Sequence, residues 1–324
     1  MFVEALQRIL QAEVTPEYVR KVEAGSAMGR GWDVLEEAGY LELLVPEAQG
    51  GAGLSLSDLY GIFHLLGAHA TPLPLADTII ARVLTATPAS LPSGPIALAS
   101  SSVALPDGGV RCANVSFGAV AGHVLAPRGL GLVLLPVASA SCSAAGLWGS
   151  QLASFDWPAD VCVPISGTGA ELSAFVATSY AAMLCGAMEQ VFRLTMQYCN
   201  DRVQFGKPLG KFQAVQHQLA VMAEHIVAAS LATQVAFSGD RLVPDMILAA
   251  IAKGRASEAA LLVANTAHAL HGAIGITAEY DLQLFTRRLH EWRITHGSET
   301  YWYRRVGEGA LGQQASFCEF VQAI

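Results

Sequence analysis

Charged side chains are scarce in this sequence: Asp, Glu, Lys and Arg make up only 14% of its 324 residues. Soluble domains usually carry about 25%, so much of this chain must be buried, either in a large core or against other subunits. Basic residues are the scarcer kind, with 19 Lys and Arg against 27 Asp and Glu and a net charge of −8. This acidic balance argues against a nucleic-acid-binding protein, which normally presents a basic patch. The 52% hydrophobic content excludes a disordered chain.

Uninterrupted hydrophobic runs of membrane-spanning length are also missing. The most apolar stretch, residues 123–142, is broken by two prolines, two glycines and an arginine, whereas a bilayer span needs about 20 apolar residues. The first 17 residues are amphipathic and unlike a secretory signal. We therefore expect a cytoplasmic protein without a membrane partner.

Motifs for metal or nucleotide binding are absent as well. The six cysteines are scattered and form no CxxC pair, so we expect reduced thiols and no disulfide framework or zinc site. His268 and His271 lie three apart, but no carboxylate stands at ligand spacing, so we expect no metal. The chain lacks GxxxxGK[ST], GxSxG and HExxH. The glycine-rich stretch at residues 50–53 follows no clear strand and predicts a surface turn.

Three segments of different texture predict an α+β fold. Residues 1–92 predict a helical domain, because apolar residues between Leu59 and Leu66 repeat at helical spacing. Residues 93–169 are nearly free of charge and carry short apolar runs separated by turn signals, which predicts a small middle β domain. Residues 170–324 predict a C-terminal four-helix bundle. Its long helices are expected near residues 184–198, 215–226, 244–269 and 280–293.

Two stretches of the C-terminal segment carry a more specific signal. Residues 198–217 read YCNDRVQFGKPLGKFQAVQH and contain R-x-x-F-G-x-x-[IL]-x-x-[FH]-Q, and residues 270–288 read LHGAIGITAEYDLQLFTRR. The first is similar to a helix–turn–helix of the acyl-CoA dehydrogenase family, and the second resembles that family's H-G-G-x-G-x-T-x-E-[YH]-x-L-x-x-x-x-R-R. The resemblance extends over about residues 30–90 and 175–310. It implies the family fold, in the same α, β, α order that the composition predicts.

The resemblance implies a flavoprotein that binds FAD. Carried onto this chain, it places the Arg202 guanidinium on the flavin pyrophosphate, usually from a neighbouring subunit, and an Arg fork pairs well with phosphate. It lets Phe205 pack against the adenosine or the flavin. Spacing alone equally allows Arg202 to satisfy helix-end carbonyls and Phe205 to be a core residue. The implied cofactor-binding residues are Arg202, Gln204, Phe205, Gln213, Gly272 and Ser298.

The family chemistry also requires a base. A carboxylate removes the α-proton of an acyl thioester while the β-hydrogen leaves as hydride to flavin N5. The family's Glu lies in a Y-E-G-T motif, and residues 295–298 here read THGS, so His296 stands at the Glu position. A neutral imidazole titrates near physiological pH, so His296 is a candidate base, with Glu299 as the alternative. Some members carry the base near the start of the first bundle helix, but Glu171, the nearest acid, lies too early.

Other family positions differ too. The middle segment has nothing like the family's T-E-P-x-x-G-S-D loop, and Ala269 and Ala273 replace a Gln and a Gly beside the His-Gly pair. Such small divergent members resemble one subunit of heteromeric bacterial acyl-CoA dehydrogenases, including those acting on steroid side chains, in which the other subunit brings the base and most flavin contacts.

We therefore predict a subunit of an FAD-dependent acyl-CoA dehydrogenase, which would desaturate an acyl-CoA thioester at its α and β carbons. The expected partners are a homologous subunit in a heterotetramer, or further copies in a homotetramer, and an electron-transfer flavoprotein as acceptor. Two alternatives stay open. One is a structural subunit or paralogue that binds no flavin, and the other is a homomeric dehydrogenase with His296 or Glu299 as base.

Overall fold

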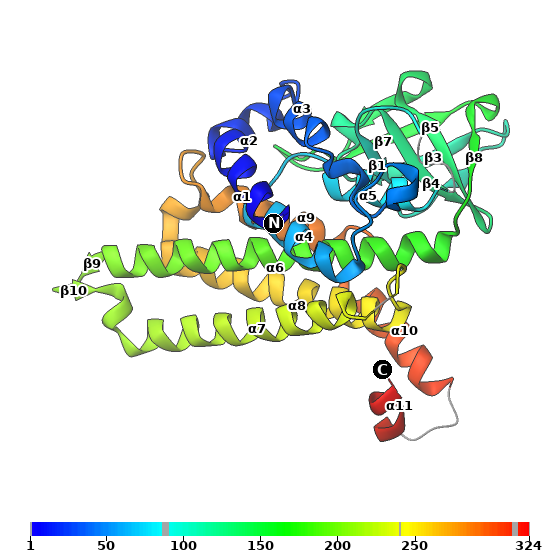
Figure 1. Cartoon of the computed structure of the whole chain (residues 1–324). Coiled ribbons are helices and arrows are strands. Elements are labelled where there is room, and N and C mark those ends of the chain that lie inside the picture. Colours follow the sequence, from blue (N-terminus) through cyan, green and yellow to red (C-terminus); the bar gives the residue numbers. More distant parts are fainter. Residues whose placement is uncertain (1, 86–90, 240, 313–316, 324) are drawn as a thin grey trace. The chain divides into compact units, whose positions relative to one another are not determined.

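The chain is organised in two compact units, each assembled from segments that are distant in sequence (Figure 1). The computed structural model describes residues 2–85, 91–239, 241–312 and 317–323. The first unit comprises Met1–Leu59, Thr71–Val176 and Gly239–Val243, and the second comprises Tyr60–Ala70, Ala177–Ser238 and Pro244–Ile324. The division into three domains stays a prediction.

Short helices open the first unit. The second of them begins with a cap: the Thr15 hydroxyl accepts a hydrogen bond from the Tyr18 N–H at 3.3 Å, and Pro16 takes the first helical position. The predicted repeat from Leu59 to Leu66 is confirmed, because its apolar residues are buried in α4. The helices of the first unit are α1 (Phe2–Glu13), α2 (Pro16–Glu23), α3 (Arg30–Glu37) and α5 (Leu75–Val83). Helix α4 (Leu56–Ala68) begins in the first unit and belongs to the second from Tyr60 on.

Two four-stranded sheets form the small β region that the sequence predicts. One has the order β1-β4-β5-β8, with β1 parallel to β4 and the other pairs antiparallel. The other has the order β2-β3-β7-β6 and is antiparallel throughout. Val124 and Leu135 from the first sheet and Phe155 and Trp157 from the second belong to one buried cluster, so the sheets share a core. The strands are β1 (Ile96–Leu98), β2 (Val103–Ala104), β3 (Val110–Val115), β4 (His123–Arg128), β5 (Gly131–Pro136), β6 (Ser141–Ala144), β7 (Ala153–Trp157) and β8 (Val163–Ile165).

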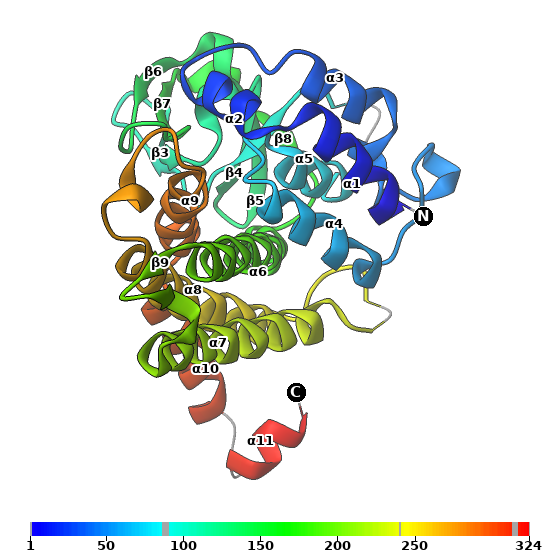
Figure 2. The ribbon, with the colours of Figure 1, turned by 90° about the vertical axis from the view of Figure 1, so that its left-hand side faces the viewer.

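Long helices make up the second unit, as the bundle prediction requires. Helix α8 packs against α7, α9 and α10, and Figure 2 looks nearly along α6 beside α7 and α8. The start of α8 is capped by Asp245, whose carboxylate accepts hydrogen bonds from the Ile247 and Leu248 N–H groups. The helices are α6 (Gly169–Asp201), α7 (Gln213–Phe237), α8 (Met246–His271), α9 (Leu282–Ile294), α10 (Glu299–Leu311) and α11 (Phe317–Ala323).

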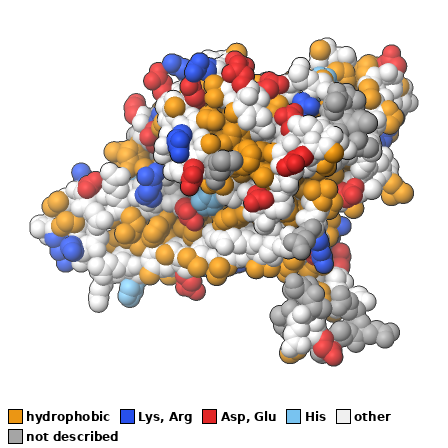
Figure 3. Space-filling model, in the orientation of Figure 1, with side chains coloured by type: hydrophobic (Ala, Val, Ile, Leu, Met, Phe, Trp, Pro, Cys, Tyr) orange, Lys and Arg blue, Asp and Glu red, His pale blue; other side chains and the backbone are white. Residues whose placement is uncertain are grey.

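Helices α6 and α7 are apolar along most of their length. By length and composition both pass the test for a membrane-crossing helix, but 89% of the apolar window of α6 is buried, as in the core helix of a bundle. In α7 only 39% of that window is buried. Figure 3 shows hydrophobic side chains along the visible face of the bundle. Exposed apolar residues on α7 include Val221, Val227, Leu231 and Val235.

Two glycines bring α4 and α6 into backbone contact. A Cβ atom added at Gly186 would lie 1.9 Å from the carbonyl oxygen of His64, and one added at Gly67 would lie 1.9 Å from that of Met183. No side chain fits at either position, because the obstructing atoms are main-chain atoms. The close approach of the two helices therefore depends on these glycines.

Candidate functional site

A short hairpin joins α6 to α7 and carries the first group of predicted site residues. Strands β9 (Val203–Gln204) and β10 (Lys207–Pro208) pair antiparallel. Phe205 and Gly206 form the turn between them, with φ angles of 54° and 80°. A two-residue turn with both residues left-handed is the tight hairpin connection that matches strand twist. A phenylalanine in this left-handed conformation is unusual, and the backbone at Phe205 is strained.

The hairpin exposes the residues that the family resemblance assigns to the cofactor. Phe205 is 90% exposed, so the alternative that it is a core residue is wrong. Its ring lies edge-on to Phe212, with 6.2 Å between centroids, and the Lys207 ammonium sits 4.3 Å from the Phe212 centroid. The Arg202 side chain is exposed, while its backbone is held by bonds to Tyr198 and Leu209.

These features suit a phosphate-bearing aromatic ligand. An exposed guanidinium offers a planar fork to phosphate oxygens, and an exposed aromatic ring offers a face for stacking. Gln204 is exposed beside the turn, and Gln213 is exposed as the first residue of α7. The residues present therefore fit the diphosphate and adenosine part of FAD.

The end of α8 lies at the same end of the bundle. His271 is buried, and its ring stacks on Tyr198 of α6 with 4.4 Å between centroids. The Tyr198 hydroxyl donates to the His271 carbonyl at 3.3 Å. Gly272 ends the helix with φ 62°, a conformation that suits glycine. Among residues with a described position, no group of three or more His, Cys, Asp or Glu is arranged to hold a metal.

The α9–α10 connection, residues 295–298, carries the second group. His296 has φ 56° and is only 7% exposed. Its ring lies edge-on to the buried Tyr180 ring of α6, with 4.8 Å between centroids. Burial, with a further contribution from the Lys253 charge, lowers the pKa of His296 to about 3. The imidazole is therefore neutral at physiological pH and is a weak base. Ser298 precedes the first residue of α10.

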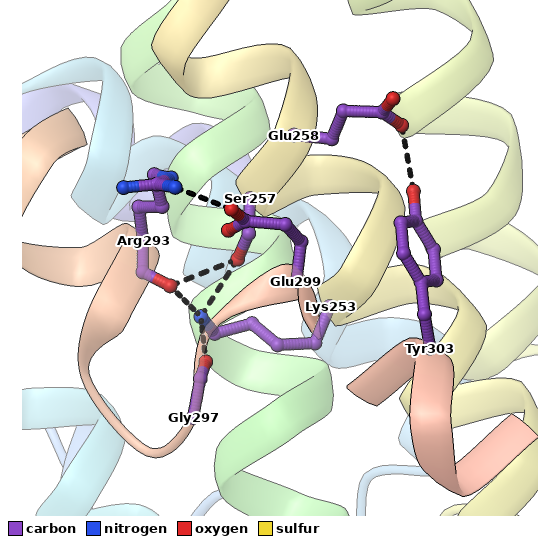
Figure 4. Close-up of polar contacts among 7 residues, drawn as sticks. All are labelled: Lys253, Ser257, Glu258, Arg293, Gly297, Glu299 and Tyr303. Atoms are coloured by element: carbon purple, nitrogen blue, oxygen red, sulfur yellow. Dashed lines mark hydrogen bonds and ion pairs between the residues drawn. The ribbon is translucent and has the colours of Figure 1, made fainter. Parts of the chain in front are cut away.

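Glu299, the alternative base, is paired with a cation. Its carboxylate forms a partly buried ion pair with Arg293 at the end of α9 (Figure 4). Glu171 lies in the first turn of α6 and accepts a hydrogen bond from the Thr168 N–H at 2.8 Å, so its carboxylate caps that helix. It also lines a cavity of about 220 Å³ in the first unit.

The structure does not bring all the predicted residues together. Tyr180, which contacts His296, and Asp201, which precedes Arg202, belong to the same helix. They are 21 residues apart, so a rise of 1.5 Å per residue separates them by about 30 Å. One group contains Arg202, Gln204, Phe205, Gln213 and Gly272, and the other contains His296, Ser298 and Glu299.

Lys253 and Tyr180 are not among the residues that the sequence motifs predict. Both are fully buried, and both contact the connection that carries His296. Lys253 is the only charged residue in the alanine-rich stretch from Ala249 to Gly254. A single cation in so apolar a helical segment is the signal that was available in the sequence, because a buried charge needs nearby polar partners.

Replacing His296 by asparagine should remove part of the acid sensitivity of the fold. The unfolded chain binds a proton at the ordinary histidine pKa of 6.5, and the folded chain binds it only near 3, so stability falls as the pH drops through this window. Between pH 7 and pH 5 the loss attributable to His296 is about 2 kcal/mol. Asparagine tolerates the left-handed backbone at this position.

Urea unfolding at the two pH values, on wild type and His296→Asn, measures this effect. Other partly buried histidines titrate in both proteins, so the difference between the two isolates His296. An identical pH dependence in both proteins would show that His296 is not held neutral.

Comparison with known proteins identifies the class. Residues 175–311 match the sequence profile described as the C-terminal domain of acyl-CoA dehydrogenases. The chain is 30% identical over 295 residues to the acyl-CoA dehydrogenase IpdE2 of Mycolicibacterium smegmatis, which covers 89% of this chain and 90% of that protein. The chain therefore belongs to the acyl-CoA dehydrogenase family, and the predicted family and enzyme class are confirmed.

Solved structures confirm the α+β fold of that family. The ChsE4-ChsE5 complex from Mycobacterium tuberculosis superposes with a TM-score of 0.84 at 22% identity, covering 97% of both chains, which shows the fold alone. A variant of the steroid acyl-CoA dehydrogenase Tcur3481-Tcur3483 superposes with a TM-score of 0.82 at 27% identity, covering 96% of both chains.

Proposed function

We propose that this chain is a subunit of an FAD-dependent acyl-CoA dehydrogenase and completes a flavin site on a neighbouring subunit. The observation that carries the proposal is the separation of about 30 Å along α6 between the hairpin and the His296 connection. The two groups are therefore far apart along one helix, and we assign them to different flavin sites. Arg202 and Phe205 at the exposed hairpin would then bind a flavin held mainly by another chain.

In this arrangement the hairpin residues have distinct tasks. The Arg202 fork would pair with the diphosphate, Phe205 would stack on an aromatic ring of the cofactor, and Gln204 would add a hydrogen bond. Gln213 and Gly272 flank the same end of the bundle. When bound, FAD supplies the two-electron acceptor for the desaturation of the acyl-CoA.

The base would come from the partner subunit. Two features of this chain support that assignment: the pKa of His296 is lowered to about 3, and Glu299 is paired with Arg293. Two structural relatives are likewise described by paired names, ChsE4-ChsE5 and Tcur3481-Tcur3483. We therefore favour a heterotetramer over a homotetramer and expect a cytoplasmic enzyme with an electron-transfer flavoprotein as acceptor. The acyl group would be that of a fatty acid or a steroid side chain.

Co-expression tests the proposal. The chain is purified alone and together with a homologous acyl-CoA dehydrogenase subunit encoded beside it, and the visible spectrum and solution mass are recorded. We expect flavin absorption and a tetramer only with the partner. Flavin in an assembly of this chain alone would overturn the heteromer and favour the homomeric enzyme. A complex without flavin would favour the structural-subunit alternative.

A further inference from the structure

Lys253 is a buried cation in the middle of the bundle. Its side chain is fully buried within α8. A buried ammonium is strongly unfavourable unless hydrogen-bond acceptors replace the lost water. Burial lowers the pKa of Lys253 to about 7, and the carboxylate of Glu299 opposes that shift. Below that pH Lys253 carries its charge inside the protein.

The acceptors for this charge are main-chain atoms of one short region. The ammonium donates to the carbonyl oxygen of Trp292 at 2.9 Å. It also donates to the carbonyl oxygens of Arg293 at 2.9 Å and Gly297 at 3.2 Å (Figure 4). The Ser257 hydroxyl, one turn along α8, accepts from Lys253 at 2.9 Å and donates to the Arg293 carbonyl at 3.0 Å. One side chain thus joins α8 to both the end of α9 and the connection that follows.

Two of these acceptors are carbonyls at the C-terminus of α9 that receive no hydrogen bond from within the helix. The last four carbonyls of a helix lack partners within it. In α9 the Glu291 carbonyl accepts from Thr295 N–H, and the Ile294 carbonyl accepts from Gly297 N–H. Trp292 and Arg293 supply the remaining two, and Lys253 binds both. A cation at a helix C-terminus also interacts favourably with the helix dipole.

The connection itself has a demanding backbone. His296 and Gly297 are both left-handed, with φ angles of 56° and 105°. A Cβ at Gly297 would lie 2.5 Å from the Tyr301 ring. A histidine keeps such a conformation only where its surroundings determine it. The bond from Lys253 to the Gly297 carbonyl acts on the residue next to His296.

We propose that Lys253 is a positioning residue, which fixes the α9–α10 connection and thereby holds the His296 imidazole buried against Tyr180. The proposal rests on the proposed function in one respect: the connection occupies the place at which the family carries its base. The placement of His296 can be measured without any catalytic activity, so the two proposals can fail separately.

Chemical labelling of histidine tests this role. Diethyl pyrocarbonate modifies neutral, accessible imidazoles, and at pH 6 His296 is neutral while Lys253 is charged. In the wild-type chain we expect His296 to react far more slowly than the exposed His217. Lys253→Met keeps a long buried side chain but removes the donors, and we expect His296 to react at least tenfold faster. Mass spectrometry of the histidine-containing peptides gives each rate.

Controls separate positioning from a general loss of packing. His271 is equally buried but lies at the other end of α8, so its protection should not change. Arg255 is a second cation on α8, and it pairs with Glu258 and not with the connection. Arg255→Met should therefore leave His296 protected. Ser257→Ala retains the Lys253 charge but loses the bond from Lys253 and the bond to the Arg293 carbonyl, and we expect a smaller rise of roughly threefold.

Two results would overturn the proposal. One is an unchanged His296 rate in Lys253→Met. The other is an equal rise at His271, which would make Lys253 a residue of the general core. If Lys253→Met does not fold, Ser257→Ala decides, because a rate at His296 equal to wild type in that variant contradicts the proposal.

Discussion

Replacing Arg202 by alanine is expected to strip most of the FAD from the assembled enzyme. Arg202 lies exposed at the end of α6, beside a turn that displays Phe205 to solvent. Its fork would make two charge-assisted hydrogen bonds to the diphosphate, and losing them weakens binding by about 3 kcal/mol, roughly a hundredfold. Flavin absorbance per protein after gel filtration of the complex measures the loss.

A matched variant distinguishes cofactor binding from a change in surface charge. Arg193 is exposed on the same helix and bonds to Gln190, away from the hairpin. Arg193→Ala should leave the flavin content intact. Arg202→Lys keeps the charge without the planar fork and should retain an intermediate amount. Wild-type flavin content in the Arg202→Ala complex would rule out the proposed contact.

Replacing Gly186 by alanine is expected to destabilise the bundle strongly. A Gly→Ala change inside a helix normally stabilises it by up to about 1 kcal/mol. At Gly186 the added Cβ would lie 1.9 Å from the His64 carbonyl oxygen and 2.9 Å from the Ala68 nitrogen. These are backbone atoms, so α4 and α6 must move apart. Overpacking of this kind costs about 3 kcal/mol or more, and thermal unfolding should shift down by roughly 5–10 °C.

The control uses a glycine with open surroundings. A Cβ at Gly307 in α10 would meet nothing within 4 Å. Gly307→Ala should therefore stabilise the protein by about 0.5–1 kcal/mol, in the direction that helix propensity predicts. Thermal scans on both variants give the comparison. A melting temperature at or above wild type for Gly186→Ala would contradict the close helix contact.

The sequence predicts the long elements well, because their periodic signal extends over many residues. The expected helix near 215–226 lies within α7, and the one expected near 244–269 matches α8 (Met246–His271) to within two residues at each end. Short strands are harder to predict from the sequence. The continuous apolar run at 130–135 predicts β5, but β3 and β7 alternate buried and solvent-facing residues, such as the paired Arg111 and Asp156, and no apolar run marks them. Strands of five or six residues leave too few positions for alternation to stand out.

The sequence supplies candidate site residues, which stay predictions, but not their arrangement in space. The motif around Arg202 marks the hairpin, and the substitution at His296 marks the connection. Neither motif contains the distance of about 30 Å between them, which follows from the unbroken course of α6. The role of Lys253 cannot be predicted from a motif for a related reason. Two of its acceptors are main-chain carbonyls some 40 residues away, and a backbone carbonyl is common to every residue type.

A structure of the assembled enzyme with FAD bound would show which flavin site each group of residues contacts. We expect the Arg202 guanidinium to lie within hydrogen-bonding distance of the diphosphate of an FAD whose flavin ring rests on a neighbouring subunit. The connection carrying His296 should lie at a different flavin site or at none. An Arg202 side chain remote from every diphosphate, or one FAD contacted by both Arg202 and His296 of the same chain, would contradict this expectation.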